Sequence, residues 1–214
     1  MRSESSPIGQ ESARTFTEAA RRAQIVAAAI DTIADLGYGQ ASLARIAETA
    51  GTSKGVIIYH FGGKDELMRE LVAEVVARGV AYMEPQVDAE PTGAGKLRAY
   101  IESNLAFMGE NRNHMVAIFE IALNARAADG SRLYDVSVHD AGVTALEQLL
   151  AYFQGTGEFR AGFDPHVMAM AIRAAINTVP AQLAQDPALD VAHHAREIAE
   201  MFHIATRPGS PPVP

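Results

Sequence analysis

Apolar residues recur along almost the whole chain at the spacing of α-helices. Val26, Ile30 and Ile33 fall on one side of a helix expected over about 17–36, since positions three or four apart meet on one face. Gly37 follows as a C-cap, because glycine readily adopts the left-handed conformation that ends helices. No stretch shows the persuasive alternation of a half-buried strand. The pattern therefore predicts an all-α protein.

Three helix signals follow in close succession after that first helix. Ser42 is an N-cap residue ahead of a short helix with apolar periodicity. Thr52 or Ser53 opens another short helix, which runs to about His60. A long helix begins near Lys64, where acidic residues in the first turn suit a helix N-terminus. Two short helices joined by a glycine-containing turn, behind a supporting helix, are the elements of a helix-turn-helix.

Further helices are expected beyond a linker over 85–95 that is rich in proline, glycine and aspartate. Helical faces recur from about residue 97, from about residue 115, and up to a Gly-x-Gly turn at 155–157. Asp164 and Pro165 form a strong helix start, as N-cap and first residue, for a helix running to about residue 185. A last helix is expected between Asp190 and Thr206.

The composition is that of a globular protein, since 48% of the residues are hydrophobic and 21% are charged. The chain has no cysteine, which excludes disulfides and thiolate metal sites. Its N-terminus lacks the apolar run of a signal peptide, and no segment approaches the ~20 apolar residues of a membrane span. A cytoplasmic protein with no cofactor, metal or membrane partner is expected.

The net charge of −8 at first argues against a nucleic-acid partner. Its distribution along the chain changes that view. Residues 1–64 carry seven Lys or Arg and six Asp or Glu, whereas the remaining 150 residues carry eleven and twenty. The acidic excess is therefore confined to the C-terminal two-thirds, and the N-terminal segment is free to approach DNA.

The stretch GTSKGVIIYHF supports two hypotheses. Its Gly51, Ser53 and Gly55 fit the G-x-S-x-G of a hydrolase nucleophile elbow, with Ser53 as nucleophile. An elbow needs a buried strand before the serine, whereas the preceding LARIAETA has helical period. His193 and His194 diverge by about 100° on a helix and make a poor metal pair. The pattern favours a DNA-binding helix and argues against an enzyme.

Residues 21–71 resemble the N-terminal domain of TetR-family transcriptional regulators. The resemblance is carried by RRAQIVAAAIDTIADLGY and SLARIAETAGTSKGVIIYHFGGKDEL, and above all by Tyr59-His60-Phe61 followed by Lys64. It implies a homodimer that binds a near-palindromic operator in double-stranded DNA and releases it when a small-molecule inducer binds. The expected function is a ligand-responsive regulator, in particular a repressor. The alternative is a helical DNA-binding protein regulated by a protein partner or by no ligand.

Carried over residue by residue, the resemblance assigns a DNA-facing surface. Base-edge contacts are expected from Lys54, Gly55, Val56 and Ile58, with the lysine suited to guanine and the aliphatic side chains to thymine methyls. The other expected DNA contacts, mostly to phosphates that position the domain without reading sequence, are Ser42, Thr52, Ser53, Tyr59, His60 and Lys64. Arg21 and Arg22 are expected on a solvated face.

For the C-terminal part, the resemblance implies a ligand pocket. Arg173 and Asn177 lie four residues apart on one helix, so they share a face that Met170 joins. An apolar pocket with a few polar groups suits a small apolar or amphipathic ligand. The further candidates for its lining are Phe107, Met108, Met115, Phe119, Asn124, Tyr152 and Phe153. The alternative is that these residues are core and that Arg173 pairs with a carboxylate at an interface.

The resemblance also implies dimerisation through the last helices. An apolar row beside the Arg173 face is expected to form the interface, and it consists of Ala169, Ile172, Ile176 and Val179. The chain as a whole is expected to have a disordered arm over 1–16, a helix-turn-helix domain over 17–63, and a helical regulatory and dimerisation domain over 64–206. The helix that starts at residue 64 links the two domains, and a polar, proline-rich tail over 207–214 is expected to be disordered.

Overall fold

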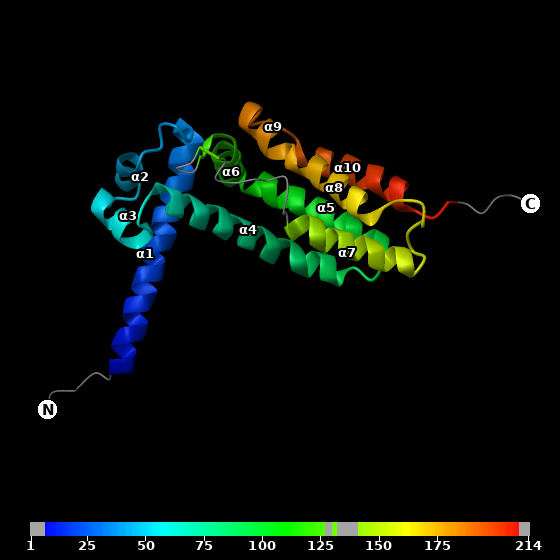
Figure 1. The fold of residues 1–214 in the computed structure, drawn as a ribbon, viewed down its shortest axis with the longest axis horizontal. Coiled ribbons are helices and arrows are strands. Elements are labelled where there is room, and N and C mark those ends of the chain that lie inside the picture. Colours follow the sequence, from blue (N-terminus) through cyan, green and yellow to red (C-terminus); the bar gives the residue numbers. More distant parts are fainter. Residues whose placement is uncertain (1–6, 127–129, 132–140, 210–214) are drawn as a thin grey trace, which may run out of the picture. The chain divides into compact units, whose positions relative to one another are not determined.

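The computed structural model describes residues 7–126, 130–131 and 141–209. The chain forms two compact units, Met1–Ala73 and Glu74–Pro214. Ten helices and no strand are found in the described ranges (Figure 1), so the expected all-α class is confirmed. The ends of the expected arm and tail, residues 1–6 and 210–214, lie outside the described residues.

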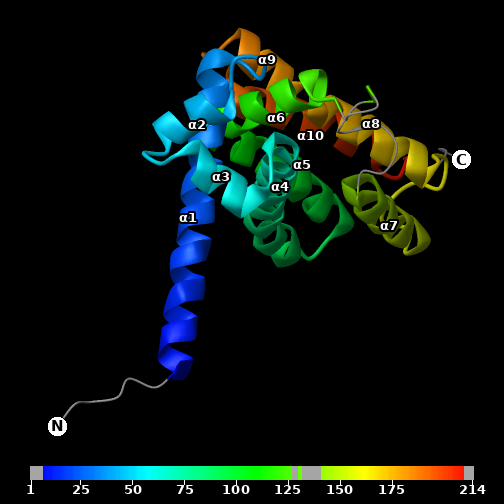
Figure 2. The same cartoon turned by 60° about the vertical axis from the view of Figure 1, so that its left-hand side comes forward.

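The first unit is built from three helices and the beginning of a fourth. These are α1 (Pro7–Leu36), α2 (Leu43–Thr49), α3 (Lys54–Phe61) and the first turns of α4 (Lys64–Ala89). Figures 1 and 2 both show α2 and α3 beside the C-terminal half of α1. Each helix contributes at least one fully buried side chain to a common core, which contains Ile25, Ile33, Ile46, Ile57 and Leu67. The apolar faces predicted from periodicity therefore meet as expected.

Serine caps and a glycine set the ends of the two short helices. The Ser42 hydroxyl accepts a hydrogen bond from the Arg45 backbone N–H, and the Ser53 hydroxyl accepts one from the Val56 N–H, both at 3.3 Å. Gly51, in the turn between the helices, has φ 59°. That left-handed conformation is strained for a residue with a Cβ atom. Residues within and next to the turn thus determine where the two helices of the helix-turn-helix begin and end.

The start of α1 differs from the expectation. The helix begins at Pro7 rather than near residue 17, so the disordered arm predicted over 1–16 is wrong for residues 7–16. Proline is favoured at the first helical position. Once a helix has formed, each residue that is added to its end becomes ordered and gains one backbone hydrogen bond, so the helix extends easily. The end agrees with the prediction, because the Gly37 N–H donates to the Ile33 carbonyl at 2.9 Å.

The linking helix α4 also extends beyond its predicted end. It begins at Lys64 as expected but continues through Pro85 to Ala89, so the linker predicted over 85–95 is reduced to about three residues before α5. The Lys96 ammonium donates to the Val87 carbonyl at 2.8 Å. This contact satisfies one of the carbonyls that a helix end leaves without a partner.

The compact units divide within α4, about ten residues after the predicted domain boundary at 63/64. Leu67, Met68 and Leu71, on the first two turns of α4, are fully buried. These side chains belong to the core of the first unit, which is why the division falls after Ala73. The remaining turns of α4 belong to the second unit, so one continuous helix contributes to both.

The second unit contains the rest of α4 and six further helices. These are α5 (Gly93–Glu110), α6 (Arg112–Asn124), α7 (Ala141–Gly155), α8 (Pro165–Asn177), α9 (Val179–Gln185) and α10 (Val191–Thr206). Within this unit α5 packs along α10, α7 along α8, and α6 against α9. The expected helix starts are confirmed, since Asp164 caps α8 and Asp190 caps α10 through backbone N–H groups at 3.0 and 2.9 Å.

The helix predicted from residue 165 to residue 185 is two helices. α8 ends at Asn177, and α9 begins at Val179. Pro180 explains the break, because its ring removes an N–H donor and collides with the carbonyl four residues earlier. An 18-residue window within Pro165–Gln185 has a mean hydropathy of 1.2 and is 28% buried. By length and composition alone, this is the one stretch of the described chain apolar enough to cross a membrane.

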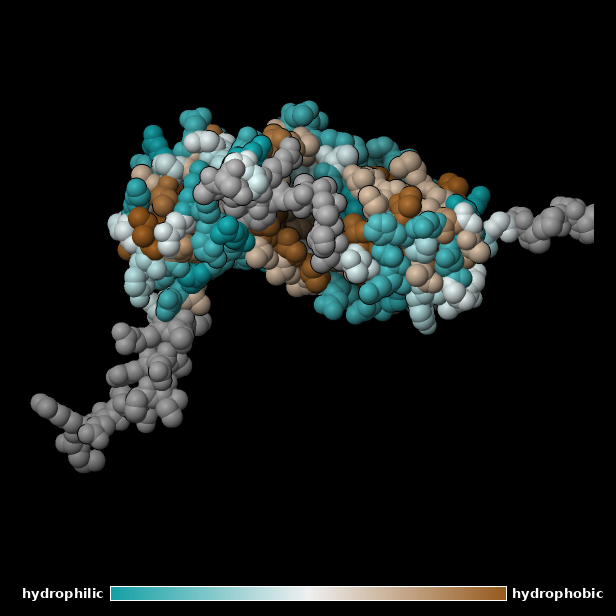
Figure 3. All heavy atoms as spheres, in the orientation of Figure 1, coloured by the Kyte–Doolittle hydropathy of each residue, from teal (hydrophilic) through white to brown (hydrophobic). Residues whose placement is uncertain are grey.

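On α8, the side predicted to lie at an interface is buried in the core, and the opposite side is exposed. Ala169, Ile172, Ile176 and Val179, predicted to form the dimer interface, are 0% exposed within a single chain. They are core residues, and the interface prediction for this row is wrong. Apolar side chains instead gather over α8 on the molecular surface (Figure 3), where Met170 is 50% exposed.

Candidate DNA-binding surface

Helix α3 presents one face to solvent and one to the core. On the outer face Ile58 is 43% exposed and Tyr59 is 79% exposed, and Lys54 and Gly55 are also exposed. Ile57 and the residue that ends the helix, Phe61, are buried. An exposed aromatic and an exposed aliphatic side chain thus lie side by side on this face of α3, which makes it the candidate surface for a partner.

The remaining residues of the predicted surface lie around this face. Ser42 and Ser53 are exposed, and Thr52 and Val56 are half-buried. The two serine hydroxyls accept backbone N–H groups as helix caps, so they stabilise α2 and α3 whether or not they contact DNA. Apart from His60, the structure brings the residues predicted from α3 and its turn together on one side of the unit.

Gly55 has no structural requirement for glycine. Its φ is not in the left-handed region, and a Cβ added there would meet only the Ser53 hydroxyl oxygen, at an ordinary contact distance of 3.7 Å. Glycine in a helix costs about 1 kcal/mol relative to alanine. The fold therefore gives no reason for glycine at this position on the exposed face of α3.

Lys64 is held inside the first unit by Tyr38. The ammonium donates to the Tyr38 carbonyl at 2.9 Å and lies 4.0 Å from the centre of the Tyr38 ring. Burial lowers the pKa of Lys64, partly offset by Asp65. The predicted phosphate-binding residue is thus fixed in place by contacts that the sequence did not reveal, at the N-terminus of α4.

We expect Lys64→Met, which removes the charge and keeps most of the stem, to weaken binding to all DNA sequences alike. Loss of one phosphate contact should flatten the dependence of log affinity on log salt by about one unit per half-site. Titrations at several salt concentrations measure this slope. Lys54→Met is the contrast and should change sequence preference. An unchanged slope in Lys64→Met would remove Lys64 from the phosphate contacts.

His60 does not share the exposure of its neighbour Tyr59. Its side chain is only 9% exposed, and Nδ1 lies 4.0 Å from a Glu18 carboxylate oxygen of α1. That buried nitrogen has no hydrogen-bond partner among the described residues. Adjacent helical positions point about 100° apart, so the two side chains face different surroundings. The sequence alone does not show which of the two faces the core. Of the pair, only Tyr59 is presented as an open contact surface.

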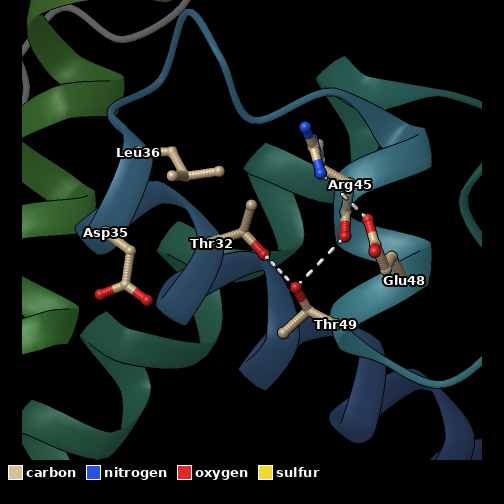
Figure 4. A pocket seen from close by; sticks show the side chains of 6 residues that line it. All are labelled: Thr32, Asp35, Leu36, Arg45, Glu48 and Thr49. Carbon is tan, nitrogen blue, oxygen red and sulfur yellow. Dashed lines mark hydrogen bonds and ion pairs between the residues drawn. The ribbon is translucent and has the colours of Figure 1, made fainter.

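A shallow pocket of about 340 Å³ lies elsewhere on the first unit, between α1 and α2 (Figure 4). Its side chains are Thr32, Asp35, Leu36, Arg45, Glu48 and Thr49. The Thr32 and Thr49 hydroxyls are 3.0 Å apart, and Arg45 pairs with Glu48 at 3.2 Å. These polar groups satisfy one another, and none of the predicted DNA contacts lines the pocket.

The predicted ligand residues of the second unit do not form one constellation. Phe107, Met108, Met115 and Phe153 are buried, and Phe119 is half-buried. The exposed members are Asn124, Tyr152, Met170 and Asn177. Arg173 is half-buried and donates to the Tyr100 hydroxyl at 3.3 Å. Met170, Arg173 and Asn177 share one side of α8, but Met170 and Asn177 are exposed there, so a ligand pocket around Arg173 stays a prediction.

Two polar residues of α5 were missed by the sequence analysis. Tyr100 faces Arg173, and Asn104, one turn further along α5, is 6% exposed. The Asn104 side chain makes no hydrogen bond to any residue in the described ranges. The available signal was the i, i+4 spacing of Tyr100 and Asn104 within an otherwise apolar helix face.

An all-α chain whose first unit is a helix-turn-helix, with α3 exposed as its second helix, is by its architecture a DNA-binding protein. Residues 25–71 match the family of bacterial regulatory proteins known as the tetR family. This match covers most of the helix-turn-helix of the first unit, which is thus similar to the DNA-binding domain of these transcriptional regulators.

Individual proteins similar to this chain are regulators by name. The chain is 35% identical over 85 residues to the HTH-type transcriptional regulator BetI 1 of Chromohalobacter salexigens, a match covering 39% of this chain and 42% of that protein. It is 22% identical to the fatty acid metabolism regulator protein of Bacillus subtilis, over 84% of this chain and 92% of the relative. The structure of the regulator FadR from Bacillus subtilis with stearoyl-CoA matches with a TM-score of 0.70 at 21% identity, over 84% and 96% of the two chains.

Proposed function

We propose that the protein is a transcriptional repressor that binds a near-palindromic operator and releases it when a small molecule binds to the second unit. The observation that carries the proposal is the geometry of α3, which turns Lys54, Ile58 and Tyr59 outward while Ile57 and Phe61 anchor it. Sequencing of genomic fragments retained by the immobilised protein tests it. We expect a few fragments sharing one motif, and uniform recovery of the genome would contradict DNA recognition.

The repressor acts as a homodimer through the outward side of α8 and the neighbouring side of α10. Val167 and Met170 of α8 are 62% and 50% exposed, and Met201 and Ile204 of α10 are 55% and 51% exposed. Exposed apolar rows of this kind on paired helices are typical of four-helix interfaces between identical subunits. The same rows explain the membrane-like hydropathy of α8 and α9 without a membrane, and we place the protein in the cytoplasm with its DNA.

The ligand is a small apolar or amphipathic molecule. The second unit buries four of the predicted lining residues, Phe107, Met108, Met115 and Phe153, which suit a hydrocarbon. The Arg173 guanidinium and the Tyr100 hydroxyl, 3.3 Å apart, suit a polar or anionic head group. A relative of similar fold is named with stearoyl-CoA, so stearoyl-CoA and free stearate are the first probes.

Release of the operator follows from coupling between the units. Helix α4 contributes to the core of the first unit and continues into the second. A ligand that prefers a conformation with displaced α4 weakens operator binding by its difference in affinity. Allosteric coupling of about 1–3 kcal/mol corresponds to roughly 5–150-fold weaker binding, and operator DNA must weaken ligand binding by the same factor. Calorimetric titration of the ligand with and without operator measures both, and equal affinities would contradict the switch.

We expect Arg173→Ala to leave operator affinity unchanged and to blunt release by an acyl ligand, because Arg173 lies in the second unit and the DNA face in the first. Tyr100→Phe, which removes only the hydroxyl, should have the same effect to a smaller degree. Arg126→Ala, at an exposed position after α6, is the control. Loss of the dimer or of folding in Arg173→Ala, with a normal response in Tyr100→Phe, would make Arg173 structural.

A further inference from the structure

Arg22 connects three helices of the first unit. Its Nε donates to one Glu70 carboxylate oxygen at 3.0 Å, and its Nη2 donates to the other. The remaining terminal nitrogen, Nη1, donates to the backbone carbonyl of His60. The guanidinium carbon also lies 4.5 Å from the centre of the Phe61 ring. The solvated face expected for Arg22 from the sequence is therefore wrong.

The His60 carbonyl that Arg22 contacts lies at the C-terminal end of α3. It belongs to the last turn of α3, where carbonyls have no partner within the helix and attract a positive charge. Arg22 of α1 supplies this positive charge, and the carboxylate of Glu70 on α4 holds its guanidinium in place. The side chains of Arg22 and Glu70 are 33% and 31% exposed, so the pair is partly shielded from water.

The same turn of α3 carries the exposed part of the DNA face. Ile58 and Tyr59 directly precede the carbonyl that Arg22 holds. We infer that Arg22 and Glu70 form a positioning pair, which fixes the orientation of the exposed face of α3 on α4 and so sets operator affinity without touching DNA. This inference rests on the proposed DNA-binding function.

The direction in which Glu70→Gln changes DNA affinity tests whether the pair has a positioning role. Removing a negative charge from a DNA-binding unit strengthens DNA binding when only long-range electrostatics acts. A positioning role predicts the opposite, since the neutral amide no longer holds the guanidinium. Glu66→Gln is the matched control: it lies one turn earlier on α4, removes the same charge, and breaks only an exposed pair with Arg69 at 2.9 Å.

The measurement is the affinity of the full-length protein for two duplexes, one selected by the wild-type protein from a random library and one scrambled. We expect Glu70→Gln and Arg22→Lys to bind the selected duplex about tenfold more weakly, the scale of one charge-assisted hydrogen bond. Their affinity for the scrambled duplex and their salt dependence should remain those of the wild type. Glu66→Gln should bind the selected duplex as tightly as the wild type or more tightly. The double variant should be no weaker than Arg22→Lys alone, because the pair acts as one unit.

Other results would overturn the inference in distinguishable ways. Equal affinity of Glu70→Gln and Glu66→Gln for the selected duplex removes the positioning role. A proportional loss on both duplexes, together with a lowered melting temperature, makes the pair a stabilising contact only. A salt dependence flattened by about one unit per half-site in Arg22→Lys, despite its retained charge, makes Arg22 a phosphate contact. If the wild type selects no sequence, the proposed function is wrong and the positioning role with it.

Discussion

Aspartate at both Met170 and Ala174 should convert the protein to a folded monomer and abolish tight operator binding. Both side chains are exposed on the outward side of α8, where they do not contribute to the core. In the dimer they would meet the same row of the partner, so the double substitution places four carboxylates in one apolar contact. Loss of the second half-site should weaken operator binding by roughly 10²–10⁴-fold, the usual gain from linked sites.

Sedimentation and operator titration of the same preparations check this prediction. Ala106→Asp, at an exposed position of α5 outside the row, is the control and should remain a dimer with normal operator affinity. Ile172→Asp is a second comparison, because Ile172 is 0% exposed and a buried charge there should unfold the second unit. A dimeric Met170→Asp, Ala174→Asp protein would place the interface on another surface.

Gly55→Leu should separate DNA binding from folding. A Cβ at this position meets nothing closer than 3.7 Å, so the side chain extends into solvent, and leaving glycine favours the helix by up to about 1 kcal/mol. Against DNA the same side chain occupies space that the close approach of α3 requires. Forcing extra atoms into a packed contact costs about 1–3 kcal/mol in each half-site, or roughly 5–150-fold for each.

Thermal melting and operator titration together measure this separation. The melting temperature of Gly55→Leu should equal or exceed that of the wild type while operator affinity falls. Gly155→Leu, at the end of α7 where an added Cβ also meets nothing within 4 Å, should alter neither quantity by much. Normal operator affinity in Gly55→Leu would mean that the exposed face of α3 does not meet DNA closely.

Local signals predicted the framework of the fold well. Ser42, Ser53, Asp164 and Asp190 all cap helices through backbone N–H groups. Such contacts depend on residues within three positions of one another, so the sequence alone determines them. The exposed face of α3 followed from the same local information, together with the family resemblance.

The errors concern choices that only tertiary packing decides. Helix α8 is apolar on two sides, and periodicity cannot tell which side meets its own core. Ile172 was therefore assigned to the interface and Met170 to the interior, the reverse of the structure. Arg22 and Glu70 are 48 positions apart in the sequence, and no local pattern predicts a pair with that separation. Pro85 was interpreted as a helix end, whereas the helix continues to Ala89.

Selection of DNA by the full-length protein tests the central claim most directly, namely that two α3 helices of a dimer recognise one operator. The protein is incubated with random duplexes about three helical turns long, and the retained DNA is amplified and sequenced. We predict two inverted half-sites whose centres are about one helical turn or a multiple apart, enriched by the wild type and not by Gly55→Leu. Enrichment of no sequence, or of one that lacks inverted symmetry, would contradict the claim.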